Sequence, residues 1–261
     1  MTIIKKIKKI IPGRTKKKII LFFHKGNRYV CPFCNYSSRD LFTIGIDSQI
    51  IIEKHIIGGG VRPGGCYNCG SIDRERLLYV YLKEKLGLFN SGKNKKILHL
   101  APEKNLSNKL LEYGFSVYIC TVYGFPEGTV FPKHVMEMNI LNIPFSDKHF
   151  DLILCNHVLE HIPNDIDAMK ELYRVLKPGG RAILQVPVSK NSQKTFEDFS
   201  ITKEEDKLKA FGQIDHVRIY GQDYTDRLKS VGFKVERINI SNEFSNYGLN
   251  KEEDIFTATR E

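Results

Sequence analysis

Polar side chains interrupt an apolar segment near the middle of the chain. Residues 150–155 form a short apolar run, the pattern of a strand that is buried on both faces. Asn156, His157, Glu160 and His161 follow it closely. Amide groups there can position a ligand, and imidazole can take up a proton near neutral pH. Ligands bind outside the carboxyl ends of the strands in an open parallel sheet, so we expect Asn156 and His157 to line a pocket.

Four cysteines form a second group that can do chemistry. Cys31 and Cys34 make one pair, and Cys66 and Cys69 make another with the same two-residue spacing. This spacing lets both thiolates of a pair reach one ion, and four thiolates favour a structural Zn²⁺ over a catalytic one. Two alternatives stay open. Disulfides would require an oxidising compartment, and a redox pair would need only one such motif, at the start of a helix.

The residues around the cysteine pairs fit tight turns. Asn35 and Gly70 directly follow the second cysteine of each pair, and both residue types tolerate the left-handed backbone conformation. Thirty-one residues separate the pairs and include Gly58–Gly60 and Pro63–Gly65. We expect this insert to form a short hairpin and a mobile loop.

A helix and a second strand follow the polar cluster. Asn164 is a good N-cap, and apolar residues recur at helical spacing from Ile166 to Leu176. Residues 177–180 (KPGG) end this helix, and residues 182–186 form the next apolar strand. The order predicts a βαβ unit with the polar cluster at the carboxyl end of its first strand.

This stretch also carries a resemblance to a known family. NHVLEHI at residues 156–162, followed by ELYRVLKPGG and a strand, resembles the second half of class I S-adenosylmethionine (SAM)-dependent methyltransferases of the type 11 group. The resemblance covers about residues 95–260. It implies SAM as cofactor and a Rossmann-like α/β fold, with a doubly wound, mostly parallel sheet and an antiparallel last strand.

Three further motifs resemble a subset of that group. CxxCGSxxRxRLL at the second cysteine pair, HxAPE at residues 99–103 and DHVRxY at residues 215–220 are similar to members with an N-terminal zinc-knuckle module. Arg74 and Arg76 have two interpretations. They form salt bridges on a solvated helix face, or they reach toward the mouth of the active site.

Residues 97–100 form the first predicted strand, and the turn after it differs from the broad family. That family has an acidic residue and three glycines there, which let the backbone approach the methionine part of SAM, but this turn has no glycine. The resemblance places His99, Ala101, Pro102 and Glu103 at the cofactor. Glu103 would hold the ammonium group of SAM or order water near it. A turn that has lost its cofactor is the alternative.

Two further cofactor contacts are changed. Family members have a carboxylate for the ribose hydroxyls after the second strand, but residues 120–123 contain none and Glu127 is the nearest acid. Residues 135–140 form the third predicted strand, and Asn139 stands where the family often has an aspartate that contacts the adenine amine. An amide oxygen can accept the same hydrogen bond without charge.

The resemblance implies methyl transfer to a small molecule or to a glycan hydroxyl, which needs a base near the acceptor proton. His216 is the first candidate and His161 the second, with a structural role as the alternative for either. The chain lacks an Asn-Pro-Pro-aromatic run after the fourth strand, which opposes methylation of nucleobase amines. An RNA-base methyltransferase and a non-catalytic binding protein of degenerate methyltransferase fold remain alternatives.

Charge and length predict the organisation of the 261 residues. The net charge of +10 lies in the N-terminal arm, because residues 1–30 hold ten Lys or Arg and no acid. The neutral remainder argues against a nucleic-acid partner. We expect a basic arm at residues 1–28, a zinc-knuckle module with a linking helix at 29–90, and a methyltransferase domain at 91–261.

The arm alternates lysine pairs with isoleucines. Ile3, Ile7, Ile10 and Ile11 can share one helix face, which predicts weak contact with an anionic membrane surface. A solvated tail packed on the body and an RNA contact are the alternatives. No apolar run approaches the roughly 20 residues of a membrane span, and Pro12 to Lys18 interrupts any secretory signal. We therefore expect a cytoplasmic protein with peripheral contact at the inner membrane face.

Two C-terminal segments complete the predicted domain. The polar stretch at residues 189–212 would lie over the strand ends as a lid. Residues 233–240 and 254–258 would pair as an antiparallel hairpin that closes the sheet.

Overall fold

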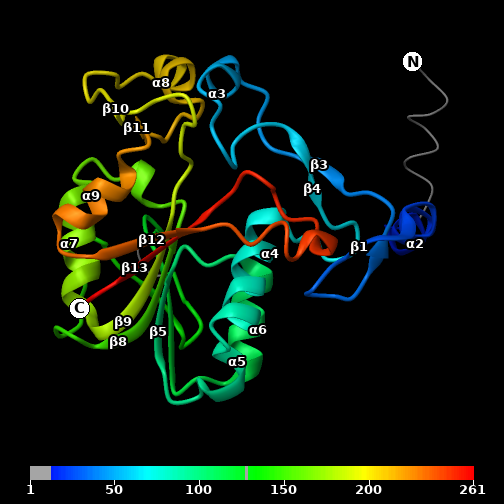
Figure 1. Ribbon diagram of the computed structural model, residues 1–261, viewed down its shortest axis with the longest axis horizontal. Coiled ribbons are helices and arrows are strands. Elements are labelled where there is room, and N and C mark those ends of the chain that lie inside the picture. Colours follow the sequence, from blue (N-terminus) through cyan, green and yellow to red (C-terminus); the bar gives the residue numbers. More distant parts are fainter. Residues whose placement is uncertain (1–12, 127–128) are drawn as a thin grey trace.

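The computed structural model describes residues 13–126 and 129–261. Its centre is a seven-stranded sheet of order β12-β13-β9-β8-β5-β6-β7 (Figure 1). The strands are β5 (Lys96–Leu100), β6 (Val117–Val122), β7 (Val135–Glu137), β8 (Phe150–Asn156), β9 (Leu176–Gln185), β12 (Lys234–Ile238) and β13 (Ile255–Thr259). Strands β5 to β9 pair in parallel, whereas β13 runs antiparallel to both β9 and β12. The predicted doubly wound sheet with an antiparallel last strand is confirmed.

The direction of strand addition reverses at β5, which pairs with β6 on one side and β8 on the other. Helices cover both faces (Figure 1). One face packs on α7 (Asp165–Val175) and α9 (Tyr224–Ser230), and the other on α4 (Asp73–Val80), α5 (Leu88–Ser91) and α6 (Lys104–Tyr113). Alternate residues of β5 pack on opposite faces of the sheet. Leu98 belongs to the hydrophobic core under α7 and α9, and Ile97 belongs to the core under α4, α5 and α6. The carboxyl end of β5 is therefore the switch point at which such sheets bind ligands.

Some local predictions need correction. The third predicted strand ends at Glu137 rather than at residue 140. Asn164 is the N-cap residue of α7, but its side chain makes no capping hydrogen bond. Asp165 instead receives hydrogen bonds from Arg227 and from the hydroxyl of Tyr220. The first turn of α7 is thus anchored by tertiary contacts of Asp165, not by a side-chain cap from Asn164.

The N-terminal part holds small pieces of sheet beside the main one. Its elements are α2 (Gly13–Phe23), β1 (Lys25–Val30), β2 (Ser37–Ser38), β3 (Phe42–Ile44), α3 (Gln49–Glu53) and β4 (Arg62–Gly65). β1 pairs with β2, and β3 pairs antiparallel with β4, which confirms the hairpin predicted between the cysteine pairs. The stretch expected to be a loop between β3 and β4 contains helix α3.

The insert between the cysteine pairs meets the predicted lid segment. The latter contains β10 (Phe196–Glu197) and α8 (Glu204–Phe211), and β10 pairs with β11 (Arg218–Ile219). Ile51 and Ile56 of the insert form a small core with Phe211 and Ile219. Figure 1 shows α3 and α8 side by side at one end of the sheet domain. Two segments that are distant in sequence thus cover this end together.

The linking helix α4 is locked to its surroundings by two buried charges. Arg76 is fully buried and donates hydrogen bonds to the carbonyls of Gly64, Ser71, Tyr247 and Gly248. The prediction of a solvated salt bridge for Arg76 is therefore wrong. Burial lowers the pKa of this guanidinium, although the nearby cysteines and Asp73 oppose the effect. The four carbonyls satisfy its donors and hold the cysteine-bearing segment against the 245–248 turn, η3 (Ser245–Tyr247).

Glu75 of α4 caps the N-terminus of helix α6. Its carboxylate accepts the backbone N–H groups of Asn105 and Leu106 and the side-chain amide of Asn105. These are donors of the first turn of α6, which no intrahelical carbonyl can satisfy. Burial raises the pKa of Glu75 despite these hydrogen bonds. Helix α4 is thus joined to α6 as well as to the C-terminal turn.

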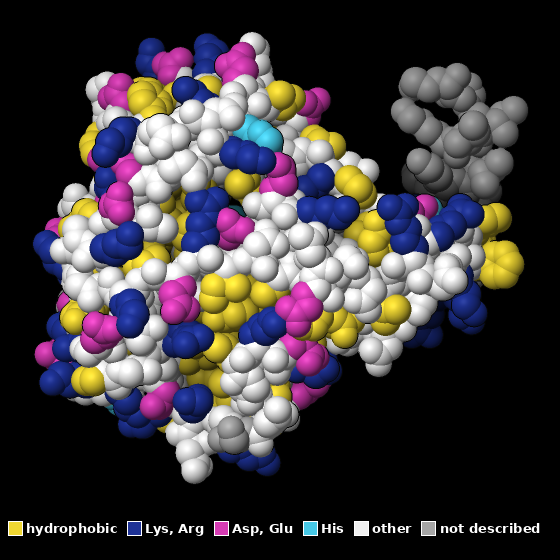
Figure 2. Space-filling view, in the orientation of Figure 1, with side chains coloured by type: hydrophobic (Ala, Val, Ile, Leu, Met, Phe, Trp, Pro, Cys, Tyr) yellow, Lys and Arg dark blue, Asp and Glu magenta, His cyan; other side chains and the backbone are white. Residues whose placement is uncertain are grey.

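The surface distribution of charge matches the sequence expectation. Figure 2 shows Lys and Arg side chains interspersed with Asp and Glu over the sheet domain. Within α2, Phe22 and Phe23 are largely exposed, at 76% and 62%.

Ile3, Ile7, Ile10 and Ile11, on which the membrane prediction depends, lie outside the described residues. In the described part of the chain, no helix has the length and apolar character that crossing a bilayer requires.

Candidate functional site

A cavity of about 340 Å³ opens at the carboxyl edge of the sheet, and we call it the edge cavity. It is bordered by residues at or just beyond the carboxyl ends of β5, β6, β7 and β8, namely Leu100, Ala101, Thr121, Val122, Tyr123, Met138, Asn139, Ile140, Leu141, Val158, His161, Ile162 and Pro163. Three predicted site residues, Ala101, Asn139 and His161, are among them. Sequence reasoning missed Thr121, Tyr123 and the apolar wall, because their residue types carry no chemical signature.

Asn139 lies at the expected edge but already has a partner. Its side-chain oxygen accepts the backbone N–H of Leu141 at 2.9 Å. A hydrogen bond to an adenine amine would therefore use the second lone pair of that oxygen. Glu127, the nearest acid for a ribose contact, lies outside the described residues.

Two backbone bends flank the switch point, and both contain a non-glycine residue with positive φ. Ala101 has a φ of +46°, and His157 has a φ of +53°. The left-handed conformation costs residues with a Cβ free energy, and such strain is concentrated at functional sites. The glycine-free turn thus makes its sharp bend by forcing an alanine into the conformation that glycine adopts easily.

Glu103 is held at the edge by a chain of polar contacts. Its Oε2 lies 3.0 Å from Nε2 of His99 and accepts a 3.4 Å hydrogen bond from Asn156 Nδ2. Nδ1 of His99 lies 2.9 Å from the hydroxyl of Tyr118. Burial raises the pKa of Glu103, but the contact with His99 outweighs it, and the pKa falls below its usual range. Glu103 is therefore a carboxylate at neutral pH, with 14% of its side chain exposed.

The predicted cofactor residues around Glu103 thus differ in their placement. His99 is fully buried and supports Glu103 instead of facing a cavity. Asn156 is also buried, and its side-chain oxygen has no hydrogen-bond partner among the described residues. Pro102 is partly buried between Ala101 and Glu103.

Arg74 of the linking helix brings a positive charge to the same place. Its charge lowers the pKa of both Glu103 and His157, for each of which burial is the largest influence. Its Nε is buried and has no hydrogen-bond partner within the described residues. Of the two arginines that the sequence singles out, only Arg74 influences the charge of these site residues.

Glu160, His161 and His216 form a cluster next to the edge cavity. One ligand atom from each lies within 4.8 Å of the other two, and the two imidazole rings are 4.7 Å apart. Both histidines were predicted, but Glu160 was not assigned a role. The structure brings His216 into the cluster through a backbone hydrogen bond from Val217 to the carbonyl of Glu160, at 3.0 Å. Burial lowers the pKa of His216 to about 4.

Arg218 and Tyr220 of the DHVRxY segment hold this cluster together. Arg218 is fully buried and donates to the carbonyls of Leu159 and Pro163 and to the carboxylate of Glu197. Tyr220 donates to Asp165. These contacts fix the 3-10 turn η2 (Leu159–His161), which carries Glu160 and His161.

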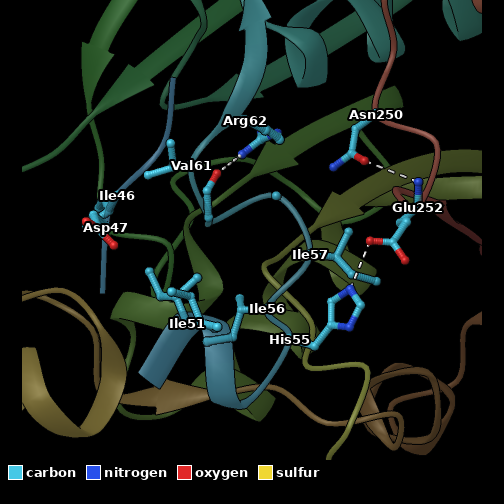
Figure 3. Close-up of a pocket in the computed structure, with 13 residues that line it drawn as sticks. Ile46, Asp47, Ile51, His55, Ile56, Ile57, Val61, Arg62, Asn250 and Glu252 are labelled. Carbon is cyan, nitrogen blue, oxygen red and sulfur yellow. Dashed lines mark hydrogen bonds and ion pairs between the residues drawn. The ribbon is translucent and has the colours of Figure 1, made fainter. Parts of the chain in front are cut away.

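A larger cavity of about 460 Å³, the outer cavity, lies between the insert and the C-terminal 250–252 loop (Figure 3). Ile51 and Ile56 point into it from one side. His55 and Glu252 contact each other at the border of the cavity, with 2.9 Å between Nε2 and Oε2. A small inner cavity of about 20 Å³ shares Ile51 and Ile56 and is bordered by Glu160 and His216. The outer cavity, the inner cavity and the histidine cluster therefore follow one another toward the sheet edge.

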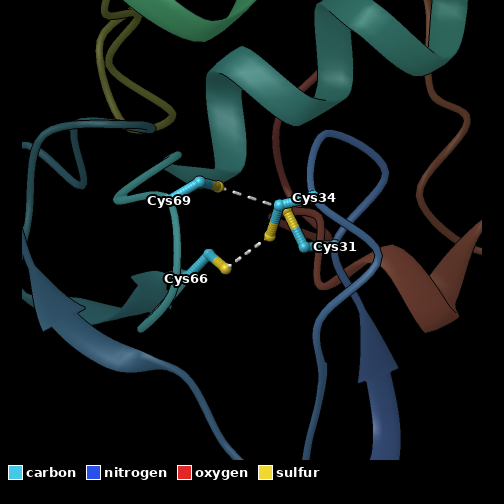
Figure 4. A group of neighbouring side chains, drawn as sticks. All are labelled: Cys31, Cys34, Cys66 and Cys69. Atoms are coloured by element: carbon cyan, nitrogen blue, oxygen red, sulfur yellow. Dashed lines mark hydrogen bonds between the residues drawn. The ribbon is translucent and has the colours of Figure 1, made fainter. Parts of the chain in front are cut away.

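The four predicted cysteine ligands are brought together (Figure 4). The Sγ atoms of Cys31 and Cys69 are 3.5 Å apart, and those of Cys34 and Cys66 are 3.7 Å apart. A tetrahedral Zn²⁺ with bonds of about 2.3 Å needs sulfur atoms about 3.8 Å apart. All four are free thiols, so they form no disulfide in the structure. The donor set and its spacing fit one zinc ion.

The turns of the cysteine pairs follow the sequence prediction. Asn35 and Gly70 have φ values of +56° and +75°. Each donates its backbone N–H to the carbonyl of the first cysteine of its pair, at 2.8 and 2.9 Å. The hydroxyl of Ser71 lies 3.3 Å from Cys31 Sγ and 3.2 Å from Cys69 Sγ.

Part of the chain is similar to known proteins. Residues 124–184 match the family described as a methyltransferase domain. Over 84 residues the chain is 43% identical to an uncharacterised protein of Methanocaldococcus jannaschii, which covers 31% of this chain and 36% of that protein. It is 32% identical over 76 residues to the ubiquinone/menaquinone biosynthesis C-methyltransferase UbiE of Vibrio parahaemolyticus, covering 28% of this chain and 29% of the relative.

Among solved structures, one similar chain is an S-adenosylmethionine-dependent methyltransferase from Mesorhizobium loti. The TM-score is 0.45 at 14% identity, covering 69% of this chain and 97% of the other. The chain spans only about a third of the length of the curated relatives above. The family match includes β7, β8, α7 and β9, but it leaves out the turn at Ala101–Glu103.

Ala101 allows a direct test of strain at the glycine-free turn. We expect Ala101→Gly to raise the free energy of unfolding by about 0.5–1 kcal/mol, because relief of the left-handed strain exceeds the added chain entropy. Ala210→Gly in the right-handed helix α8 is the matched control and should lower it by about 1 kcal/mol. Urea unfolding of both variants provides the measurement. A loss of stability in Ala101→Gly as large as in the control would contradict the argument.

Proposed function

We propose that the protein is a SAM-dependent methyltransferase that acts on a hydroxyl group of a small molecule or glycan. The observation that carries this proposal is the edge cavity at the switch point of the sheet, bordered partly by the segment that matches the methyltransferase family. The proposed domain is residues 91–261, preceded by the module at 29–90 and the arm at 1–28.

The residues at the edge fit the two ends of SAM. The edge cavity would take the nucleoside, with the largely exposed ring of Tyr123 at its border and Asn139 near the base. The methionine part would lie between the Ala101–Glu103 and Asn156–His157 bends. Glu103 supplies a carboxylate for the ammonium group, and the unpartnered Nε of Arg74 supplies a donor for the carboxylate group.

The acceptor would enter through the outer cavity. Its isoleucine side suits an apolar surface of the acceptor, and its His55–Glu252 side suits hydroxyl groups. Bound SAM supplies a methyl group already activated by its sulfonium. The chain contributes alignment of the acceptor and exclusion of water by α3 and α8. His216, with His161 next to it, would accept the acceptor proton, because its depressed pKa keeps its imidazole neutral at pH 7.

Two other functions remain testable. An RNA-base methyltransferase would use the cysteine module as an RNA clamp, and salt-dependent RNA binding by a chain without residues 1–30 would favour it. A non-catalytic binding protein would have lost the cofactor through its glycine-free turn. The charged Glu103 and the unpartnered Arg74 at the edge favour a bound zwitterion over this second alternative.

Cofactor binding can be tested through Arg74. We expect SAM and S-adenosylhomocysteine to bind the intact protein in isothermal titration calorimetry. Arg74→Met should raise the Kd for both about tenfold to a hundredfold, because a charge-assisted hydrogen bond contributes roughly 1.5–3 kcal/mol. Lys83→Met, an exposed cation of the same helical segment, is the control and should bind normally. No heat with the intact protein would refute the enzyme, and unchanged affinity in Arg74→Met would remove Arg74 from the site.

The cysteine cluster would hold a structural Zn²⁺. We expect one zinc ion per chain bound to thiolates, released by Cys66→Ser with loss of the module's folded structure. Cys120→Ser is the control, since this buried cysteine lies in β6, away from the cluster. Metal analysis and circular dichroism provide the measurements. A metal-free protein that keeps its full fold would contradict the assignment.

The basic arm would bring the protein to an anionic membrane surface from the cytoplasmic side. The exposed Phe22 and Phe23 beside Lys16–Lys18 support this contact. We expect liposomes that contain anionic lipid to co-sediment the intact chain more than a chain without residues 1–20, with the difference lost at high salt. Equal sedimentation of both chains would exclude the contact.

A further inference from the structure

A carboxylate is buried at the sheet edge without a hydrogen-bond donor. Glu160 is only 1% exposed, and neither of its side-chain oxygens has a hydrogen-bond partner among the described residues. His157 Nδ1 lies 3.3 Å from Oε1, but the contact does not have hydrogen-bond geometry. A buried carboxylate without donors is costly unless a cation compensates for it. Glu160 therefore has one ion-pair neighbour, His157, and no hydrogen bond that compensates for its burial.

Two imidazoles meet this carboxylate from different segments. One ligand atom of each of Glu160, His161 and His216 lies within 4.8 Å of the others. Nδ1 of His161 lies 3.2 Å from the carbonyl oxygen of Asp215 and 3.3 Å from its carboxylate. Metal-ligating histidines usually make such a contact through one ring nitrogen. His216 is buried and makes no side-chain hydrogen bond among the described residues.

We propose that Glu160, His161 and His216 bind a divalent transition-metal ion, separate from the zinc of the cysteine cluster. Two imidazoles and one carboxylate favour ions such as Fe²⁺, Co²⁺ or Zn²⁺ over Mg²⁺ and Ca²⁺, which prefer oxygen ligands. Three protein ligands leave coordination positions open, as in catalytic metal sites.

The location gives this ion a role in the chemistry. Glu160 and His216 border the inner cavity, and His161 borders the edge cavity. The ion would thus lie between the proposed acceptor path and the proposed cofactor. A Lewis acid there lowers the pKa of an acceptor hydroxyl. With the ion bound, His216 is a ligand and no longer takes the proton that it would accept in the metal-free protein. The hydroxyl proton then leaves to water, the oxygen lone pair forms the new O–C bond, and the electron pair of the broken S–C bond stays on sulfur. This role rests on the proposed function, whereas binding of the ion does not.

Cobalt distinguishes the two metal sites. We expect the chelator-treated full chain to take up one Co²⁺ with a thiolate charge-transfer band and a second Co²⁺ with only the weak visible bands of nitrogen and oxygen ligands. Glu160→Gln and His216→Gln should each abolish the second uptake and keep the first, whereas Cys66→Ser should remove the thiolate band. His149→Gln, a partly buried histidine next to the amino end of β8, is the control and should keep both.

The outcomes separate this inference from the proposed function. Uptake of only the thiolate-bound Co²⁺ by the intact protein would overturn the second site, as would a second uptake that persists in both Glu160→Gln and His216→Gln. SAM titration of the same samples reports independently on the cofactor. If SAM binds and the second Co²⁺ does not, the metal site fails and the methyltransferase stands. If the second Co²⁺ binds and SAM does not, the metal site stands and the methyltransferase proposal fails. Near-ultraviolet circular dichroism verifies that each variant is folded. If only one of Glu160→Gln and His216→Gln is folded, that variant alone is sufficient to test the second metal site.

Discussion

The arrangement of the site depends on the burial of one guanidinium. Arg76 is completely removed from water, and its donors are satisfied by carbonyls from the second cysteine pair, the β4 strand and the 245–248 turn. A buried cation with its donors left unpaired would be strongly destabilising, so these segments are held in one mutual arrangement. The same helix carries Arg74 to the sheet edge and Glu75 to the start of α6. A small module with little core of its own thereby becomes part of the wall of the site.

A second buried arginine fixes the opposite wall. Arg218 binds the carbonyls that follow β8 and the carboxylate of Glu197, so the segment between β9 and β11 is tied to the turn that carries Glu160 and His161. The insert between the cysteine pairs then meets the segment between β9 and β11, because α3 of the former packs on α8 of the latter. In both cases a guanidinium with several donors connects irregular segments that have no regular ladder of backbone hydrogen bonds. This explains how long, polar connections can enclose cavities at defined positions.

The carboxyl edge of the sheet carries two of the five non-glycine residues with positive φ among the described residues, together with several unsatisfied polar groups. Ala101 and His157 adopt left-handed backbone conformations there, and the side chains of Arg74, Asn156 and Glu160 carry buried polar atoms without partners. Elsewhere in the described chain, the buried arginines are well satisfied. The contrast favours a site arranged for ligands rather than a fold weakened by degeneration.

The sequence by itself determined the elements with strong periodicity and the residues with distinctive chemistry. The strands around residues 97 and 152, the hairpin of β12 and β13 and the four-cysteine cluster follow from apolar alternation, turn residues and the spacing of the cysteines, because these signals are local. The sequence also singled out His161 and His216, but it could not show that they are neighbours, nor that Glu160 joins them.

Only the tertiary structure decided which polar residue is buried and what it faces. Arg74 and Arg76 are two positions apart on one helix, yet one reaches the site and the other is sealed among carbonyls. His99 and Glu103 were assigned to one cofactor turn, but His99 lies beneath it as a support. The physical reason is that burial and pairing arise from segments far apart in the chain, and no local pattern records which of them will meet.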